Sequence, residues 1–143
     1  MSEHFRRLER MYAAAPINLY FQPRLHIPEA GVAELRLTIR PDFHHAAGAA
    51  HGAVYFKALD DATFFAANSV VEDVFVLTVS FNLYLTRPIA RGEVIARGRL
   101  VSRSKRLFVA EGILEDERGR EIARGSGAFM PGNTMLNADI GYR

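Results

Sequence analysis

The side chain in this sequence that is best suited to chemistry is the carboxylate of Asp60. It stands in a run, from about residue 51 to residue 68, in which apolar side chains predominate. A carboxylate can act as a general base or as a nucleophile, and burying one without a partner costs free energy. The presence of Asp60 therefore needs a reason, which is catalysis, a structural pair with a donor, or exposure to solvent.

Small residues and histidines occupy positions 44 to 53, in the order His-His-Ala-Ala-Gly-Ala-Ala-His-Gly-Ala. Small residues let a backbone approach a ligand closely, and the start of a helix supplies N–H groups and a partial positive charge. Such a site suits an oxyanion or a polarised carbonyl, and the N–H of Gly52 is the candidate donor. His51 has a second interpretation, as a helix-start residue that hydrogen-bonds to the loop backbone.

The histidines of this loop also raise the question of a metal site. His45 and His51 lie six positions apart across a loop, unlike the two histidines of a helical zinc motif. The chain contains no cysteine, which excludes a thiolate metal site, a cysteine nucleophile and a disulfide framework. We therefore expect no metal ion and no cofactor.

A helix from about His51 to Asn68 is predicted to carry Asp60. At about 100° per residue, its residues form one broad apolar face of the kind that packs on a sheet. This face comprises Val54, Tyr55, Ala58, Leu59, Ala62, Phe65 and Ala66.

A second apolar patch on the opposite side of this helix surrounds Asp60 and consists of Phe56, Phe64 and Ala67. The narrow polar strip that is left consists of Lys57, Asp61 and Asn68, and we interpret Asp61 as a surface residue. A helix that is apolar nearly all round is buried nearly all round. We therefore expect a second copy of the chain to cover the second patch, most simply by two-fold symmetry.

The elements around this helix are predicted from hydrophobic periodicity. A short amphipathic helix spans residues 1–15, capped by Ser2 and stopped by Pro16, and residues 18–27 look extended. Strands are expected at 32–39, 75–87, 93–102, 106–116 and 121–130, with a hairpin turn at 117–120 and a loop or frayed tail at 131–143. The odd-numbered residues from Phe75 to Leu85 should share one side of their strand. This order of elements predicts a single α+β domain over residues 1–143.

The composition limits which classes of binding partner the protein can have. Basic and acidic residues number 18 and 16, which gives no large positive footprint for nucleic acid. The N-terminus is charged and lacks the apolar core of a signal peptide, and no apolar run reaches the roughly 20 residues of a membrane span. We expect a cytoplasmic protein that binds neither nucleic acid nor membrane.

In combination these motifs resemble the PaaI-like hotdog thioesterases, from about Leu8 to Met130. The family motif is a His-Gly-Gly helix start with an aspartate nine positions after the histidine, and here His51-Gly52-Ala53 is followed by Asp60. A later strand that leads to a proline and a glycine also matches, as do the basic residues beyond it, and these segments are residues 77–82, Pro88, Gly92 and 103–106 with Glu111.

The resemblance implies a hotdog fold, in which an antiparallel sheet of five to six strands wraps one long central helix, with a short N-terminal helix added. It implies a two-fold dimer, often paired into a tetramer, with active sites at the subunit interface. It also implies the activity of an acyl-CoA thioesterase, whose only coenzyme is the coenzyme A of its substrate.

The resemblance further implies roles for single residues. Gly52 would polarise the thioester carbonyl, Asp60 of the other subunit would be the general base or nucleophile, and Thr78 would assist. The residues that would contact the substrate, as its acyl pocket or along the coenzyme A arm, are Phe56, Phe64, Ser80, Pro88, Arg103, Ser104, Lys105 and Arg106.

Two departures from the family pattern are Ala53 in place of the second glycine and His45 in place of an asparagine that helps to hold the carbonyl. An imidazole N–H can still donate a hydrogen bond, although it differs in length and in titration. Two other functions stay open, which are an enoyl-CoA hydratase or dehydratase that uses His51 with Asp60, and a non-catalytic acyl-CoA-binding module. The basic turn at 103–106 is equally compatible with a solvated hairpin.

Overall fold

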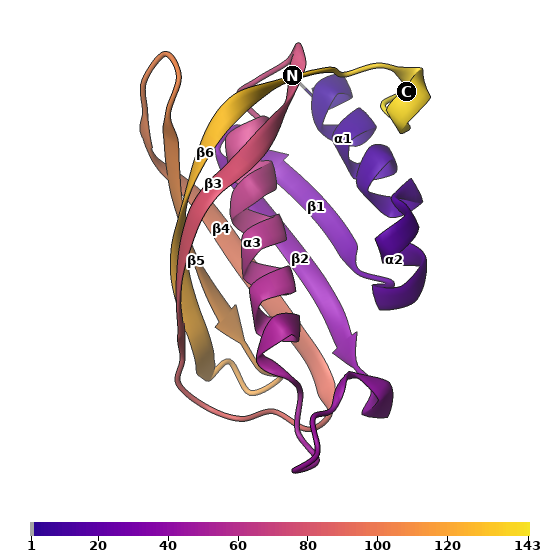
Figure 1. Ribbon diagram of the computed structural model, residues 1–143, viewed down its shortest axis with the longest axis vertical. Coiled ribbons are helices and arrows are strands. Elements are labelled where there is room, and N and C mark those ends of the chain that lie inside the picture. The colour runs from indigo at the N-terminus through magenta and orange to yellow at the C-terminus, as the bar shows by residue number, and fades with distance from the viewer. Residues whose placement is uncertain (1) are drawn as a thin grey trace.

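The computed structural model describes residues 2–143 and places a curved sheet around one long helix (Figure 1). The helices are α1 (Ser2–Ala14), α2 (Pro16–Phe21) and α3 (Gly52–Asn68), and two 3₁₀ turns are η1 (Pro41–Phe43) and η2 (Ala138–Ile140). The strands are β1 (Arg24–Glu29), β2 (Val32–Ile39), β3 (Val74–Leu85), β4 (Gly92–Arg103), β5 (Phe108–Glu115) and β6 (Glu121–Met135). The sheet is antiparallel, in the order β1-β2-β4-β5-β6-β3. The predicted α+β hotdog fold is confirmed.

Two glycines let α3 lie close to the middle of the sheet. Gly98 on β4 pairs with Gly112 on β5, and both lack a Cβ on the side that faces the helix. A Cβ at Gly98 would lie 2.5 Å from the carbonyl oxygen of Ala62, and one at Gly112 would lie 3.0 Å from a methyl group of Leu59. All residues of the predicted broad face of the helix are buried, and α3 contacts every strand of the sheet.

The segment after Pro16 differs from the prediction. Pro16 ends α1 but also begins α2, because proline lacks only an N–H that the first turn of a helix leaves unbonded. The residues expected to be extended from position 18 are therefore helical up to Phe21, and strand β1 begins at Arg24. Helix α1 packs its apolar stripe inward, and this stripe consists of Phe5, Leu8, Met11 and Tyr12.

Strand β3 does not keep the regular alternation that its sequence suggests. Irregularities in its pairing with β6 fall between Val74 and Val76 and between Thr78 and Ser80. A bulge shifts which side of a strand its later residues face. The expectation that the odd-numbered residues from Phe75 to Leu85 share one side was wrong, since Thr78 before the irregularity and Phe81 after it both contact α3.

The C-terminal segment is more ordered than expected. Strand β6 continues past residue 130 to Met135, and the remaining residues turn back beside α1 (Figure 1). The hydroxyl of Tyr142 lies 2.7 Å from Nδ1 of His4, and the side chain of Arg10 donates to the backbone carbonyl of Arg143. The prediction of a loop or frayed tail at 131–143 was wrong, because β3 pairs with the chain up to Met135 and helix α1 holds its last residues.

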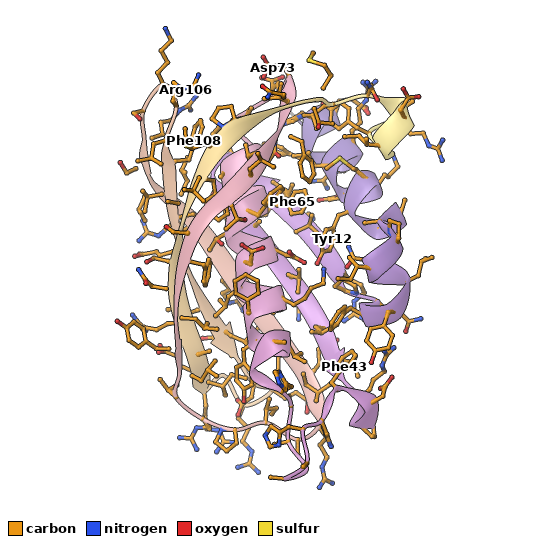
Figure 2. The ribbon with its side chains drawn as sticks, viewed as in Figure 1. Tyr12, Phe43, Phe65, Asp73, Arg106 and Phe108 are labelled. Carbon is orange, nitrogen blue, oxygen red and sulfur yellow. The ribbon has the colours of Figure 1, made fainter. Side chains whose placement is uncertain are left out.

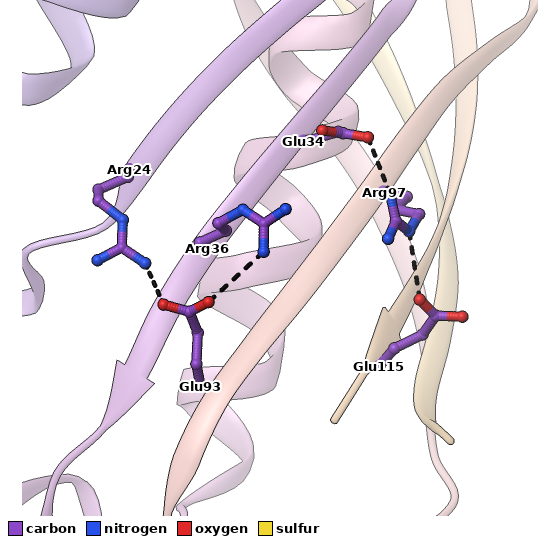
Figure 3. Close-up of polar contacts among 6 residues, drawn as sticks. All are labelled: Arg24, Glu34, Arg36, Glu93, Arg97 and Glu115. Carbon is purple, nitrogen blue, oxygen red and sulfur yellow. Dashed lines mark hydrogen bonds and ion pairs between the residues drawn. The ribbon is translucent and has the colours of Figure 1, made fainter. Parts of the chain in front are cut away.

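The outer face of the sheet carries crossed ion pairs over β1, β2, β4 and β5 (Figure 3). Arg97 lies 2.8 Å from Glu34 and 3.2 Å from Glu115, while Arg24 and Arg36 both contact Glu93. Exposed pairs of this kind add little stability, so their main effect is to leave this face hydrated. Along residues 2–143, no helix has both the length and the apolar character that crossing a bilayer demands.

Candidate active site

Asp60 lies half-buried near the middle of α3, facing strand β3. The hydroxyl of Thr78 on β3 donates a hydrogen bond to Oδ1 of Asp60 over 2.9 Å. Burial raises the pKa of Asp60 from 3.8 to about 6, and the adjacent anion of Asp61 adds to this, while the Thr78 hydrogen bond and the cation of Lys57 oppose it. Asp60 is thus a stronger base than an ordinary aspartate, yet still mostly ionised at neutral pH.

A cavity of about 780 Å³ opens beside Asp60 and Thr78. Helix α3 forms one wall, and the others come from β3, from the junction of α1 and α2, and from the C-terminal segment around η2. Its apolar lining includes Met11, Ile17, Phe64, Phe65, Phe75 and Ile140. The cavity therefore offers a mostly apolar space whose lining includes the carboxylate of Asp60 and the hydroxyl of Thr78.

The two aromatic residues predicted to form an acyl pocket lie in different places. Phe64 is buried and lines the cavity, where its ring lies 5.0 Å from that of Phe75. Phe56 is 42% exposed and packs edge-on against Phe81, with ring centres 5.5 Å apart, away from the cavity. The second apolar patch around Asp60 is thus covered in part by β3 of the same chain.

The polar strip expected on the surface of α3 is largely buried. Asp61 Oδ2 accepts from Lys57 Nζ and from the Tyr12 hydroxyl, both at 2.6 Å, and the two charged side chains are only 16% and 12% exposed. Asn68 is fully buried and holds the chain that follows α3 through hydrogen bonds with three backbone groups. The interpretation of Asp61 as a surface residue was wrong, because α1 covers this side of α3.

Helix α1 brings Tyr12 to this strip, where its ring meets Phe65 edge-on with ring centres 5.0 Å apart (Figure 2). Neither Tyr12 nor Lys57 was predicted from the sequence as a site residue. One signal was present, since Tyr12 lies in the apolar stripe of α1 and a buried tyrosine hydroxyl requires a hydrogen-bond partner.

The start of α3 is held by its own loop. His51 is the N-cap, and its Nδ1 accepts from the N–H of Ala53 over 2.9 Å, as the helix-start interpretation expects. His45 is exposed, and its Nδ1 accepts from the N–H of Ala47 over 3.0 Å. These bonds leave the Nε2 of each ring as its N–H donor when the imidazole is neutral. Gly52 follows as the first residue of the helix.

Gly52 and Asp60 of one chain cannot act on the same carbonyl. They lie eight positions apart on one helix, so at about 1.5 Å per residue their backbones are about 12 Å apart. Loop residues Pro88 and Ala90 lie beside the helix start, where the Ala90 carbonyl contacts His44 and the Arg87 carbonyl accepts from Tyr55. His45, His51, Gly52 and Pro88 therefore form one group, and Asp60, Thr78 and Phe64 another.

The basic turn lies apart from both groups. Residues Arg103 to Arg106 are exposed on the hairpin between β4 and β5, at the end of the molecule opposite the start of α3 (Figures 1 and 2). Ser80 is exposed on β3, two residues beyond Thr78 and past the irregularity in the strand. One chain by itself thus does not bring the basic turn and Pro88 to a common coenzyme A path.

The side chains in residues 2–143 form no cluster of three or more possible metal ligands. The loop histidines His44, His45 and His51 each contact a backbone group instead.

Comparison with known proteins relates this architecture to one family. The family model described as the thioesterase superfamily matches residues 47–123, just over half of the chain. A search of curated proteins found no match.

Three solved structures share the fold over nearly the whole chain. The Escherichia coli PaaI protein from the phenylacetic acid degradation operon is 15% identical and has a TM-score of 0.86, with 95% of this chain and 98% of that chain covered. A phenylacetic acid degradation-related protein from Ralstonia eutropha is 24% identical, with a TM-score of 0.79 and coverages of 89% and 98%. A thioesterase from Haemophilus influenzae is 14% identical, with a TM-score of 0.79 and 87% of each chain covered.

Proposed function

Because this chain belongs to the thioesterase superfamily, we propose that it hydrolyses an acyl-coenzyme A to the free acid and coenzyme A. Membership of the family, with the shared fold, confirms the predicted PaaI-like hotdog thioester hydrolase. The acyl-CoA substrate and the roles of single residues are what the proposal adds.

The observation that carries the proposal is the hydrogen-bonded pair of Asp60 and Thr78 in the lining of a mostly apolar cavity. The acyl group would occupy the cavity, which places its carbonyl carbon near Asp60. Asp60 then removes a proton from water as the water attacks this carbon, or attacks the carbon itself to form an anhydride that water cleaves. In both routes the C–S bond breaks and the coenzyme A sulfur leaves as a thiolate that takes up a proton.

The second half of the site comes, in this proposal, from another copy of the chain. Strand β3 is at the edge of the sheet, where within residues 2–143 it pairs only with β6, and it exposes Leu77, Val79 and Leu85. An edge strand with exposed apolar side chains is a surface that pairs with another strand. Two-fold pairing of β3 with its counterpart would make a dimer with one continuous sheet.

This symmetry would also reunite the separated groups of residues. The start of α3 and the turn between β4 and β5 lie at opposite ends of one chain (Figure 1). A two-fold axis that crosses β3 would reverse the second copy, so that its Gly52, His45 and Pro88 would lie at the end of this chain that carries the basic turn. The N–H of the second Gly52 would then stabilise the oxyanion, with the His45 ring as an additional donor. Arg103, Lys105 and Arg106 would meet the coenzyme A phosphates, with Ser80, Ser104 and Pro88 along its path.

The hydratase alternative is less well supported by this geometry. It requires the imidazole of His51 to act together with Asp60, and because the two are nine positions apart on one helix, or about 14 Å, this His51 would also have to come from a second copy. The His51 ring is also engaged in capping α3.

The test is the Asp60→Asn variant assayed on a panel of aryl, short-chain and medium-chain acyl-CoAs. Removal of a general base or nucleophile should lower kcat by about 10²–10⁴-fold on every thioester that the wild type cleaves. Asp73→Asn, an exposed aspartate at the end of the molecule, is the matched control and should retain full activity. Undiminished hydrolysis by a folded Asp60→Asn variant would refute the proposal, and binding of acyl-CoA without turnover by the wild type would identify a binding module.

A further inference from the structure

A buried charge cluster stands next to Asp60 and takes no part in the proposed chemistry. Lys57 Nζ lies 2.6 Å from Asp61 Oδ2, and the same oxygen accepts from the hydroxyl of Tyr12 on α1 over 2.6 Å. The ammonium of Lys57 also lies 5.2 Å from the ring centre of Tyr12 and 5.4 Å from that of Phe21. Burying an ion pair costs free energy of desolvation, so packing alone is a weak reason for it.

The cluster lines the same cavity as Asp60 and follows it directly in sequence. Charges in a partly buried cavity act on one another more strongly than charges in water. Any change in the charge of Lys57 or Asp61 must therefore shift the protonation equilibrium of the Asp60 carboxylate.

We propose that Lys57 and Asp61 are positioning residues whose opposite charges balance each other at Asp60, and that Tyr12 holds them in place from helix α1. The anion of Asp61 opposes a second negative charge on Asp60, and the cation of Lys57 favours it. The pair is nearly neutral as a whole, so that Asp60 keeps the basicity that its own burial provides. This role rests on the proposed function of Asp60 in hydrolysis.

Apart from Lys57 and Asp61, the groups that face Asp60 stay uncharged or are exposed to solvent. Strand β3 contributes the hydroxyl of Thr78, which does not titrate. Helix α1 contributes Tyr12, whose pKa is raised by burial and by Asp61, so that its hydroxyl stays a donor. The C-terminal segment contributes Asp139 and Arg143, which line the cavity with opposite charges and are exposed to solvent.

Opposing effects act on the pKa of Asp61 itself. Burial raises its pKa, whereas the cation of Lys57 and the hydrogen bonds from Lys57 and Tyr12 lower it. Without Lys57, two adjacent carboxylates would share one cavity, and such a pair binds its first proton at higher pH than either alone.

The experiment is a ¹³C NMR titration of the aspartate carboxyl groups in the whole protein, with Asp60→Asn used to assign the Asp60 signal. Asp61→Asn should move the Asp60 midpoint to lower pH by about half a pH unit or more, because it removes an anion and leaves the cation. Lys57→Met should move the first protonation of the Asp60 and Asp61 pair to higher pH. The double variant should return the Asp60 midpoint close to that of the wild type.

The two opposite shifts distinguish this role from a purely structural one. Loosened packing in the variants would move the Asp60 midpoint in the same direction in both, and that result, or no movement, would overturn the inference. If Lys57→Met does not fold, the comparison of Asp61→Asn with the double variant isolates the charge of Lys57, and the Asp60 midpoint must be lower in the single variant.

The titration is independent of the proposed function. The acid limb of kcat/KM, measured on the best substrate of the acyl-CoA panel, should follow the NMR midpoints in each variant. If Asp60→Asn keeps full activity, the proposed function fails while the titration still decides this inference. Asp73→Asn serves as the charge control and should leave the Asp60 midpoint unchanged.

Discussion

The start of α3 and its middle are built in different ways. At the start, His51 and His45 each accept a hydrogen bond from a backbone N–H two positions further along. In the middle, Asp60 meets a hydroxyl 18 positions later in the chain, and Asp61 meets Tyr12 49 positions earlier. The first region is a local structure near the surface. In the second, β3 and α1 both contact α3 in a partly buried environment.

This contrast explains which features each region can contribute to catalysis. A helix start offers fixed N–H groups without the cost of burying a charge, which suits an oxyanion. The middle of the helix offers low polarity and neighbouring charges, which change the basicity of a carboxylate. Because α3 keeps the two regions about 12 Å apart, the proposed function takes one region from each of two chains.

The sharpest test of the helix start is Gly52→Pro. Gly52 is the first residue of α3, where proline is well tolerated, and His51 before it has a compatible extended backbone. The substitution removes the one N–H in question with little effect on the helix. Loss of an oxyanion donor should lower kcat by about 10²–10³-fold. Full activity in this variant would show that the Gly52 N–H is not a donor.

Mixing this variant with Asp60→Asn tests whether the two regions come from different chains. In a mixed dimer, one site would combine an intact Asp60 with an intact Gly52, and the other site would have neither. Random exchange of subunits should therefore restore about a quarter of wild-type activity. Equal activity before and after mixing would mean that each site lies within one chain.

The pH dependence of kcat/KM tests the middle of the helix. With the pKa of Asp60 raised to about 6, the basic form is present above pH 6 and is lost as the pH falls. The rate constant should therefore decline about tenfold per pH unit below pH 6. An acid limb near pH 4 would indicate an ordinary, solvated aspartate.

Thr78→Val tests the contact between α3 and β3 by replacing the hydroxyl with a methyl group of similar size. The hydrogen bond from Thr78 lowers the pKa of Asp60, so the acid limb should move to higher pH in the variant. Loss of a hydrogen bond to a charged group should also lower kcat/KM by about tenfold, as for a loss of 1.5 kcal/mol. The measurement is the complete pH profile of the folded variant.

The smallest expected effect is on the free energy of unfolding. Asp60→Asn should increase it, although the same variant should lose activity. The pKa of Asp60 is higher in the folded protein than its ordinary 3.8, so the ionised carboxylate destabilises the fold above pH 6. Asp60→Asn should therefore raise the free energy of unfolding at pH 7 by about 1–2 kcal/mol, allowing for solvent screening. This gain should shrink as the pH falls from about 6 towards 4, which denaturant titrations at several pH values would measure.

Several parts of the structure could be read from local patterns. Strand β2 was predicted with its observed bounds, and α3 within one residue, because alternation and helical spacing persist over their length. The His51 cap follows from residues within two positions. The bulges in β3 were not predictable in this way, since they depend on its pairing with β6.

The sequence by itself determined the fold class, the long helix with Asp60 on it and the likeness to a thioesterase family, because periodicity and motif spacing are properties of neighbouring residues. Only the tertiary structure decided that Asp61 is buried beneath α1, that Thr78 contacts Asp60, and that Phe56 points away from the cavity. These depend on how distant elements pack, and a helical wheel shows which residues share a face without showing what covers it.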